Sequence, residues 1–167
     1  MDAPEPGRVD APTGPSGYTG RDWPGGVQDP QDPSVRELQA ILGEARTIAV
    51  VGLSTDRTRD AYDVAEYLQE KGYRIVPVNP HVTEVLGEQA YPSLLDVPEK
   101  VDVVDVFRRA DKTPEIARQA VEIGAKVLWL QSGIINEEAA RIATEAGLDV
   151  IMGVCIRTAK RRVEREA

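Results

Sequence analysis

The sequence is poor in cysteine and in long apolar runs, and both absences narrow the classes of protein to which it can belong. Of its 167 residues only Cys155 is a cysteine, so the chain can form no intramolecular disulfide. No apolar run approaches the roughly 20 residues that a membrane-spanning helix needs. The first residues also lack the basic start and the apolar core of a secretory signal. We therefore expect a cytoplasmic protein without membrane contacts.

Basic residues and histidine are scarce as well. The chain has 20 Lys and Arg against 28 Asp and Glu, a net charge of -8, which argues against a nucleic-acid partner because such proteins carry a basic footprint. One histidine and one cysteine cannot form the usual zinc ligand sets. The histidine, His81, is expected in an exposed loop. We assign no metal ligand and no catalytic residue.

Residues 1–33 differ in composition from the rest of the chain. They contain seven prolines and six glycines, with little apolar periodicity. Such a segment cannot bury enough apolar surface to offset the cost of ordering its backbone, about 1 to 2 kcal/mol per residue. We expect a disordered tail over residues 1–33, followed by a single folded domain over residues 34–167.

Strands and helices are expected to alternate through this domain. Ser34 and Glu37 form a capping-box pattern that starts a helix ending near Ala45. Runs of Val, Ile and Leu predict strands at 47–52, 73–78, 102–107, 126–131 and 148–152, and helices are expected at 60–71, 113–123, 136–146 and after Cys155. An extended piece near 86–91 and a helical turn after Ser93 complete the pattern. The predicted fold is α/β: a doubly wound, mainly parallel five-stranded, Rossmann-like sheet with helices on both faces.

The dinucleotide fingerprint is also missing. A G-x-G-x-x-G turn after the first strand would need glycines where Ser54 and Arg57 stand, and only Gly52 is present. No acidic residue follows the second strand, where one would bind a ribose hydroxyl. An NAD(P)- or flavin-dependent oxidoreductase is therefore disfavoured, and it stays the enzyme alternative.

The loop after the first strand nevertheless suits a diphosphate. Gly52 permits close approach of the backbone, Ser54 and Thr55 offer hydroxyl groups, and Arg57 and Arg59 offer guanidinium groups shortly before a helix. An alternative is that the hydroxyl groups only cap the helix. Arg108 or Arg109, directly after the third strand, is expected at the same edge of the sheet and favours anion binding.

Two more loops are expected at this edge. Val78, Asn79 and Pro80 end the second strand, and Asn79 either contacts a base or ribose or simply forms a turn. Gln131 and Gly133 follow the fourth strand and are placed to form the opposite wall.

These residues resemble a known family, the small stand-alone CoA-binding proteins related to the N-terminal domain of the succinyl-CoA synthetase alpha subunit. The resemblance covers about residues 36–163. It is carried by V-G-L-S at 51–54, R-D-A-Y at 59–62, G-Y-R-I-V-P-V-N-P at 72–80, D-V-F-R at 105–108 and W-L-Q-S-G at 129–133, with a cysteine near the end. It implies a small nucleotide ligand, coenzyme A or an acyl-CoA, bound without turnover.

The resemblance also implies roles for individual residues. Gly52, Ser54 and Arg59 would hold the diphosphate of CoA, Asn79 and Pro80 would flank the adenosine, Phe107 and Arg108 would border the crevice, and Gln131 and Gly133 would line the pantetheine side. The sequence departs from the family at Asp60, where a serine is common. A homo-oligomer and a ligase partner both stay open. Cys155 is expected to be a packing residue, with a redox role as the alternative.

Overall fold

Five short runs of Val, Ile and Leu build the centre of the molecule. The computed structural model describes residues 26–166, in which these runs form one parallel sheet with the strand order β2-β1-β5-β6-β7. The strands are β1 (Thr47–Val51), β2 (Arg74–Val78), β5 (Val103–Val106), β6 (Val127–Leu130) and β7 (Asp149–Ile151). The predicted Rossmann-like α/β fold is confirmed.

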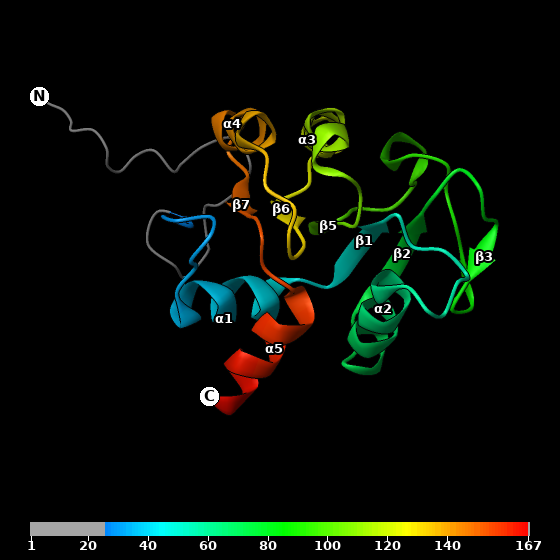
Figure 1. The fold of residues 1–167 in the computed structure, drawn as a ribbon, viewed down its shortest axis with the longest axis horizontal. Helices are drawn as coiled ribbons and strands as arrows, with labels where there is room; N and C mark the ends of the chain where they lie inside the picture. The colour runs from blue at the N-terminus through cyan, green and yellow to red at the C-terminus, as the bar shows by residue number, and fades with distance from the viewer. Residues whose placement is uncertain (1–25, 167) are drawn as a thin grey trace, which may run out of the picture.

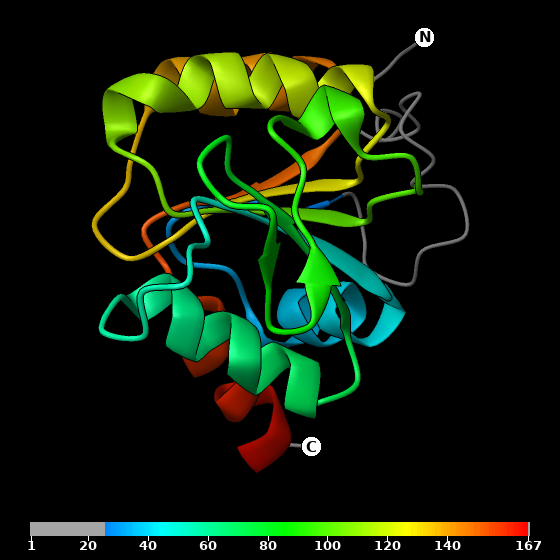
Figure 2. The same cartoon turned by 90° about the vertical axis from the view of Figure 1, so that its right-hand side faces the viewer.

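Helices cover both faces of the sheet (Figures 1 and 2). On one face lie α1 (Val35–Glu44), α2 (Asp60–Glu70) and α5 (Ile156–Arg165), and on the other lie α3 (Thr113–Glu122) and α4 (Glu137–Glu145). Neighbouring residues of a strand point to opposite faces, so Ile48 and Val50 pack toward α1 and α5, whereas Ala49 and Val51 pack toward α3 and α4. Strands buried on both faces explain why their sequences are continuous apolar runs. None of the helices within residues 26–166 has the length and apolar character needed to cross a membrane.

The start of α1 confirms the predicted capping box. The Ser34 hydroxyl accepts from the amide of Glu37 at 3.1 Å, and the Glu37 carboxylate accepts from the amide of Ser34 at 2.8 Å. The segment just before this cap runs along the open edge of β7. The amide of Val27 donates to Asp149 Oδ1 at 3.0 Å, and the amide of Met152 donates to the carbonyl of Pro30 at 2.9 Å. Contacts with the domain therefore begin before Ser34, and residues 1–25 of the expected tail lie outside the described residues.

The expected extended piece near 86–91 is a small antiparallel hairpin. Its strands are β3 (Glu84–Val85) and β4 (Glu88–Gln89), and Leu86 turns the chain with a positive φ of 56°. The expected turn after Ser93 is the short helix η2 (Leu94–Asp96), which packs on the α3 side of the sheet.

The order of the strands reverses beside β1. The chain passes from β1 outward to β2, then returns to place β5 on the other side of β1. The loops that leave β1 and β5 therefore diverge at their carboxyl ends, and a crevice opens between them. In open parallel sheets this switch point is where ligands bind.

Candidate ligand-binding crevice

Gly52 brings the ends of β1 and β5 into close contact. Its φ is +100°, and a Cβ atom built on it would lie 2.5 Å from the carbonyl oxygen of Phe107. The amide of Phe107 donates to the carbonyl of Val51 at 2.9 Å, and the amide of Gly52 donates to Val78 at 2.9 Å. Both the backbone conformation and the space therefore require glycine at position 52.

The loop after Gly52 is held by its own side chains. Ser54 Oγ accepts from the amide of Asp56 at 3.2 Å, and Asp56 Oδ1 accepts from the hydroxyl of Thr58 at 2.6 Å and from its amide at 3.0 Å. The hydrogen bonds from Thr58 lower the pKa of Asp56 below its usual value. These contacts close the loop on itself. The N-cap of α2 is Arg59, and within residues 26–166 no side chain caps the helix, so the hydroxyl groups do not serve the capping role left open above. The first amides of α2 thus have no side-chain acceptor in this part of the chain.

A first hollow of about 350 Å³ lies between this loop and the end of β5. It is lined by Gly52, Arg59, Asp60, Ala61, Phe107, Arg108, Arg109 and Ile134. The guanidinium groups of Arg59, Arg108 and Arg109 thus line the same hollow. The Arg59 side chain is 74% exposed, and its Nε lies 3.8 Å from Asp56 Oδ2. Guanidinium groups next to free helix amides are suited to a phosphate group. Asp60 is the one carboxylate in the lining.

A second hollow of about 230 Å³ adjoins the first on the α3 side of the sheet. Its lining is mostly apolar and includes Val51, Val78, Pro80, Pro92, Leu94 and Ile116, with Ser93, Arg108, Lys112, Glu115 and Gln119 around them. Arg108 lines both hollows. The two spaces therefore form one crevice with a cationic part and an apolar part.

Asn79 connects two of the loops that form this crevice. Its Nδ2 donates to the carbonyl of Leu53 at 3.2 Å, and its Oδ1 accepts from the amide of His81 at 2.8 Å. Val78 and Pro80, which the sequence predicted as site residues at the end of β2, line the second hollow. His81 is exposed, as expected. Thr55 is also exposed and lines neither hollow.

The structure places Gln131 below the crevice. The side chain is 3% exposed; its Nε2 donates to Asp105 Oδ1, and its Oε1 accepts from the amide of Ile156 at 3.3 Å. Gly133 is exposed, with a φ of +80°. It makes the turn that brings Ile134 into the lining of the first hollow. The wall after β6 is therefore an apolar side chain that the sequence analysis did not name.

Asp105 is the other residue that the sequence analysis missed as an individual. It lies on the central strand β5 and is fully buried, and burial raises its pKa to about 8, opposed by the hydrogen bond from Gln131. The available indication in the sequence was an acid inside an otherwise apolar strand, V-V-D-V.

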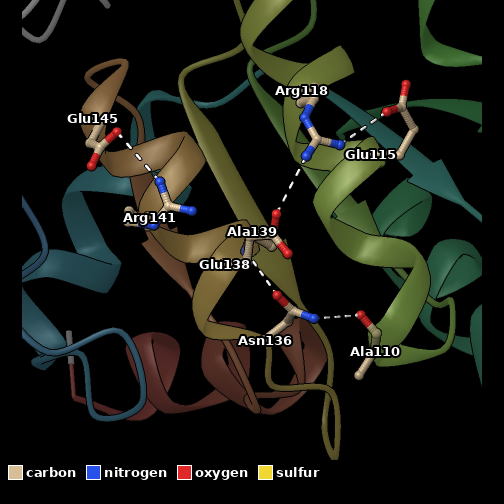
Figure 3. Close-up of polar contacts among 8 residues, drawn as sticks. All are labelled: Ala110, Glu115, Arg118, Asn136, Glu138, Ala139, Arg141 and Glu145. Carbon is tan, nitrogen blue, oxygen red and sulfur yellow. Dashed lines mark hydrogen bonds and ion pairs between the residues drawn. The ribbon is translucent and has the colours of Figure 1, made fainter.

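The loops after β5 and β6 are tied together on the α3 and α4 side (Figure 3). Asn136, the N-cap of α4, accepts from the amide of Ala139 at 2.8 Å and donates to the carbonyl of Ala110 at 2.9 Å. Ala110 begins the short helix η3 (Ala110–Lys112), so the bond fixes the segment that follows Arg108. Arg118 of α3 also contacts Glu138 of α4 at 3.4 Å, as Figure 3 shows.

Cys155 is the N-cap of α5 and is half-buried against the core on the α1 and α5 side. This position agrees with the expected packing role. Within residues 26–166 no group of three or more His, Cys, Asp and Glu side chains is placed to hold a metal ion.

These features define a Rossmann-like α/β domain with a cation-lined crevice at the switch point of its sheet. Residues 46–161 match a family described as CoA binding domain, and the chain belongs to this family. The family resemblance inferred from the sequence is confirmed.

Three similar proteins place the chain within the family. It is 43% identical over 129 residues to YneT, an uncharacterised protein of Bacillus subtilis, covering 77% of this chain and 96% of that protein. A solved structure, a hypothetical protein from Pyrococcus horikoshii OT3, is similar with a TM-score of 0.77 and 42% identity, covering 78% of this chain and 92% of that one. Acetate–CoA ligase (ADP-forming) II of Archaeoglobus fulgidus is 29% identical over 98 residues, which are 58% of this chain and 15% of the ligase.

Proposed function

We propose that this protein binds coenzyme A or an acyl-CoA in the crevice at the carboxyl edge of its sheet, as a binding or sensing module without turnover of its own. The observation that carries the proposal is the pair of adjoining hollows, one cationic and one apolar, with Arg108 in both. A ligand with a diphosphate between a nucleoside and an uncharged arm has the matching distribution of charge.

The diphosphate is assigned to the first hollow. Gly52 leaves room for it against the backbone, Arg59 and Arg108 supply guanidinium groups, and the uncapped start of α2 supplies amides. Ser54 is assigned a hydroxyl contact there. Each charge-assisted hydrogen bond contributes about 1.5 to 3 kcal/mol. In an acidic protein this local cluster of arginines provides the attraction that the net charge does not.

The adenosine is assigned to the second hollow, beside Val78 and Pro80. Phe107 is half-buried in the lining of the first hollow and is assigned a contact with the ligand there. The pantetheine arm is then directed past Gly133 and Ile134, with Gln131 acting from below through its contacts rather than by touching the ligand.

A role as the CoA-binding partner of an acyl-CoA ligase is the second candidate. It is favoured by the similarity to the Archaeoglobus fulgidus ligase, of which this chain matches only a small part. Copurification with a larger chain would favour this role, whereas a solitary protein that still binds CoA would favour the sensing module. The cytoplasmic location and the oligomeric state stay predictions.

Titration calorimetry with CoA, acetyl-CoA, NAD and NADP tests the proposal. We expect CoA and acetyl-CoA to bind at least tenfold more tightly than NAD and NADP. Arg108→Ala should weaken CoA binding by roughly 10- to 100-fold, the equivalent of one or two charge-assisted hydrogen bonds. The matched control is Arg141→Ala, which removes an exposed arginine of α4 that pairs with Glu145, as Figure 3 shows. Comparable affinity for all four ligands would contradict the proposal.

A further inference from the structure

Asp105 is a buried acid in the centre of the sheet that the proposed ligand contacts do not use. It lies on β5 opposite Val50 of β1 and Trp129 of β6, and its exposed fraction is 0%. Its Oδ1 accepts from Gln131, and its Oδ2 is buried with no hydrogen-bond partner among the described residues. A carboxylate in this position would be a buried and unpaired charge, which is costly.

Gln131 connects this acid to the start of α5. The amide side chain donates to Asp105 with its nitrogen and accepts from the amide of Ile156 with its oxygen. Turning the side-chain amide over would place donor against donor at Ile156 and oxygen against oxygen at Asp105, so the two contacts together fix its orientation. One side chain thus joins the ends of β5 and β6 to the first turn of α5.

Two of these three segments, the ends of β5 and β6, lead into the lining of the crevice. Phe107, whose carbonyl oxygen limits the space at Gly52, comes two residues after Asp105. Arg108, which lines both hollows, comes one residue later, and Ile134 follows Gln131 by three residues. A shift of Asp105 or Gln131 would therefore move walls of the crevice on both sides.

Among the described residues no charged neighbour stabilises an ionised Asp105. Burial raises its pKa, and the hydrogen bond from Gln131 opposes this rise. The buried titratable groups on this face of the sheet have other partners: Glu37 of α1 accepts from Gln28 and Ser34, Asp149 of β7 accepts from Val27, and Tyr73 donates to Leu42. Two ion pairs lie on this face, Asp63 of α2 with Arg157 of α5 and Lys71 with Glu164. Three cations lie over aromatic rings: Lys160 over Tyr73, Arg161 over Tyr67 and Arg57 over Tyr62. Cys155 is half-buried. The other charged residues of α1, α2 and α5 are exposed or half-buried.

We propose that Asp105 is a positioning residue: it holds Gln131 and, through Gln131, the start of α5, so that the crevice keeps its ligand-binding shape. Its ionisation weakens ligand binding, because a buried carboxylate whose Oδ2 has no partner disturbs this packing. The inference rests on the proposed function for its effect on CoA. The contact between Asp105, Gln131 and Ile156 does not depend on the identity of the ligand.

Calorimetric titration with CoA between pH 6 and pH 9 measures the effect. If only the protein with neutral Asp105 binds, a pKa of about 8 leaves roughly one tenth of the protein competent at pH 9, so the apparent affinity falls about tenfold. Asp105→Asn keeps the acceptor for Gln131 and cannot ionise. We expect this variant to match the unmodified protein at pH 6 and to lose the tenfold decline. Ionisation of CoA itself affects both proteins equally and cancels in the comparison.

Glu122→Gln is the matched control. It also replaces one carboxylate by an amide, at the exposed end of α3 and outside the lining of both hollows. We expect it to show the same pH profile as the unmodified protein. Equal profiles for Asp105→Asn and Glu122→Gln would overturn the inference.

Hydrogen exchange at the amide of Ile156 gives a readout that needs no ligand. Corrected for the intrinsic exchange rate, its protection should fall in the unmodified protein as the pH rises from 6 to 9, and it should stay constant in Asp105→Asn. Gln131→Met, which keeps the volume and removes the amide, should lose this protection already at pH 6. Absence of CoA binding at every pH would contradict the proposed function, whereas an Ile156 amide whose protection is independent of pH and of Gln131 would contradict the positioning role.

Discussion

Replacing Gly52 by alanine tests the closest contact in the crevice, and the chain contains its own control. Gly52 and Gly72 have nearly the same φ, +100° and +99°. A Cβ atom on Gly52 would lie 2.5 Å from the carbonyl oxygen of Phe107, whereas one on Gly72 would meet nothing within 4 Å. The two substitutions therefore share the backbone strain and differ in the collision.

The expected losses of stability follow from these two contributions. A left-handed conformation costs a residue with a side chain about 1 to 2 kcal/mol, so Gly72→Ala should lower the free energy of unfolding by about that amount. Gly52→Ala adds the displacement of Phe107, for which an overpacked site typically costs a further 1 to 3 kcal/mol or so. The total of about 2 to 5 kcal/mol corresponds to a decrease in Tm of several degrees more than for the control.

Urea denaturation and calorimetric titration with CoA measure both consequences. We expect Gly52→Ala to be the less stable variant and to bind CoA at least tenfold more weakly, because the new methyl group occupies the first hollow or pushes Phe107 into it. Gly72 lies after α2, outside the lining of both hollows, so Gly72→Ala should keep the affinity. If the two variants lost equal stability, the close approach of β1 and β5 at Gly52 would be refuted.

Three further outcomes are expected. The folded protein holds the pKa of Asp105 at about 8 against an ordinary value of 3.8, so it binds more protons than the unfolded chain between these values. The free energy of unfolding should therefore decline from about pH 4 to pH 8, by up to about 6 kcal/mol, and Asp105→Asn should remove this part of the slope in urea denaturation at several pH values. Tyr73→Phe removes the hydrogen bond of 2.5 Å to the carbonyl of Leu42 and should lower the free energy of unfolding by about 1 to 3 kcal/mol. The CoA affinity should be unchanged, since Tyr73 lies before β2, away from the crevice. A weaker affinity would show that the two ends of the sheet are coupled. Arg108→Ala should change the thermal midpoint little, because the side chain is exposed, and a large decrease would mean that its effect on binding is structural.

Apolar runs, helix-capping residues and glycines predicted the helices and strands of this fold correctly. The five strands and the covering helices occur where the runs of Val, Ile and Leu and the capping residues placed them. The strand ends are shorter than expected, because Gly52 turns out of β1 with a positive φ and Gln131 leaves β6 to bind Asp105. The single turn η3, which fixes the segment after Arg108, was not foreseen. Short helices of this kind depend on neighbours such as Asn136, which are distant in sequence.

The roles of individual site residues were harder to predict. The expectation that Gly52, Arg59 and Arg108 share one edge of the sheet agrees with the lining of the first hollow. Gln131 follows a strand in the same way, yet its side chain is buried. The difference arises because a strand end specifies where a side chain begins, whereas its direction depends on which partners lie on each face.

The sequence by itself determined that this is a parallel α/β domain whose candidate ligand-binding residues follow strands, because hydrophobic periodicity and loop composition are local properties of the chain. Only the tertiary structure decided that two hollows share Arg108 and that Asp105 is buried without a counter-charge from residues 26–166. Both depend on strand order and packing between residues far apart in sequence, and the resulting loss of solvent around Asp105 raises its pKa.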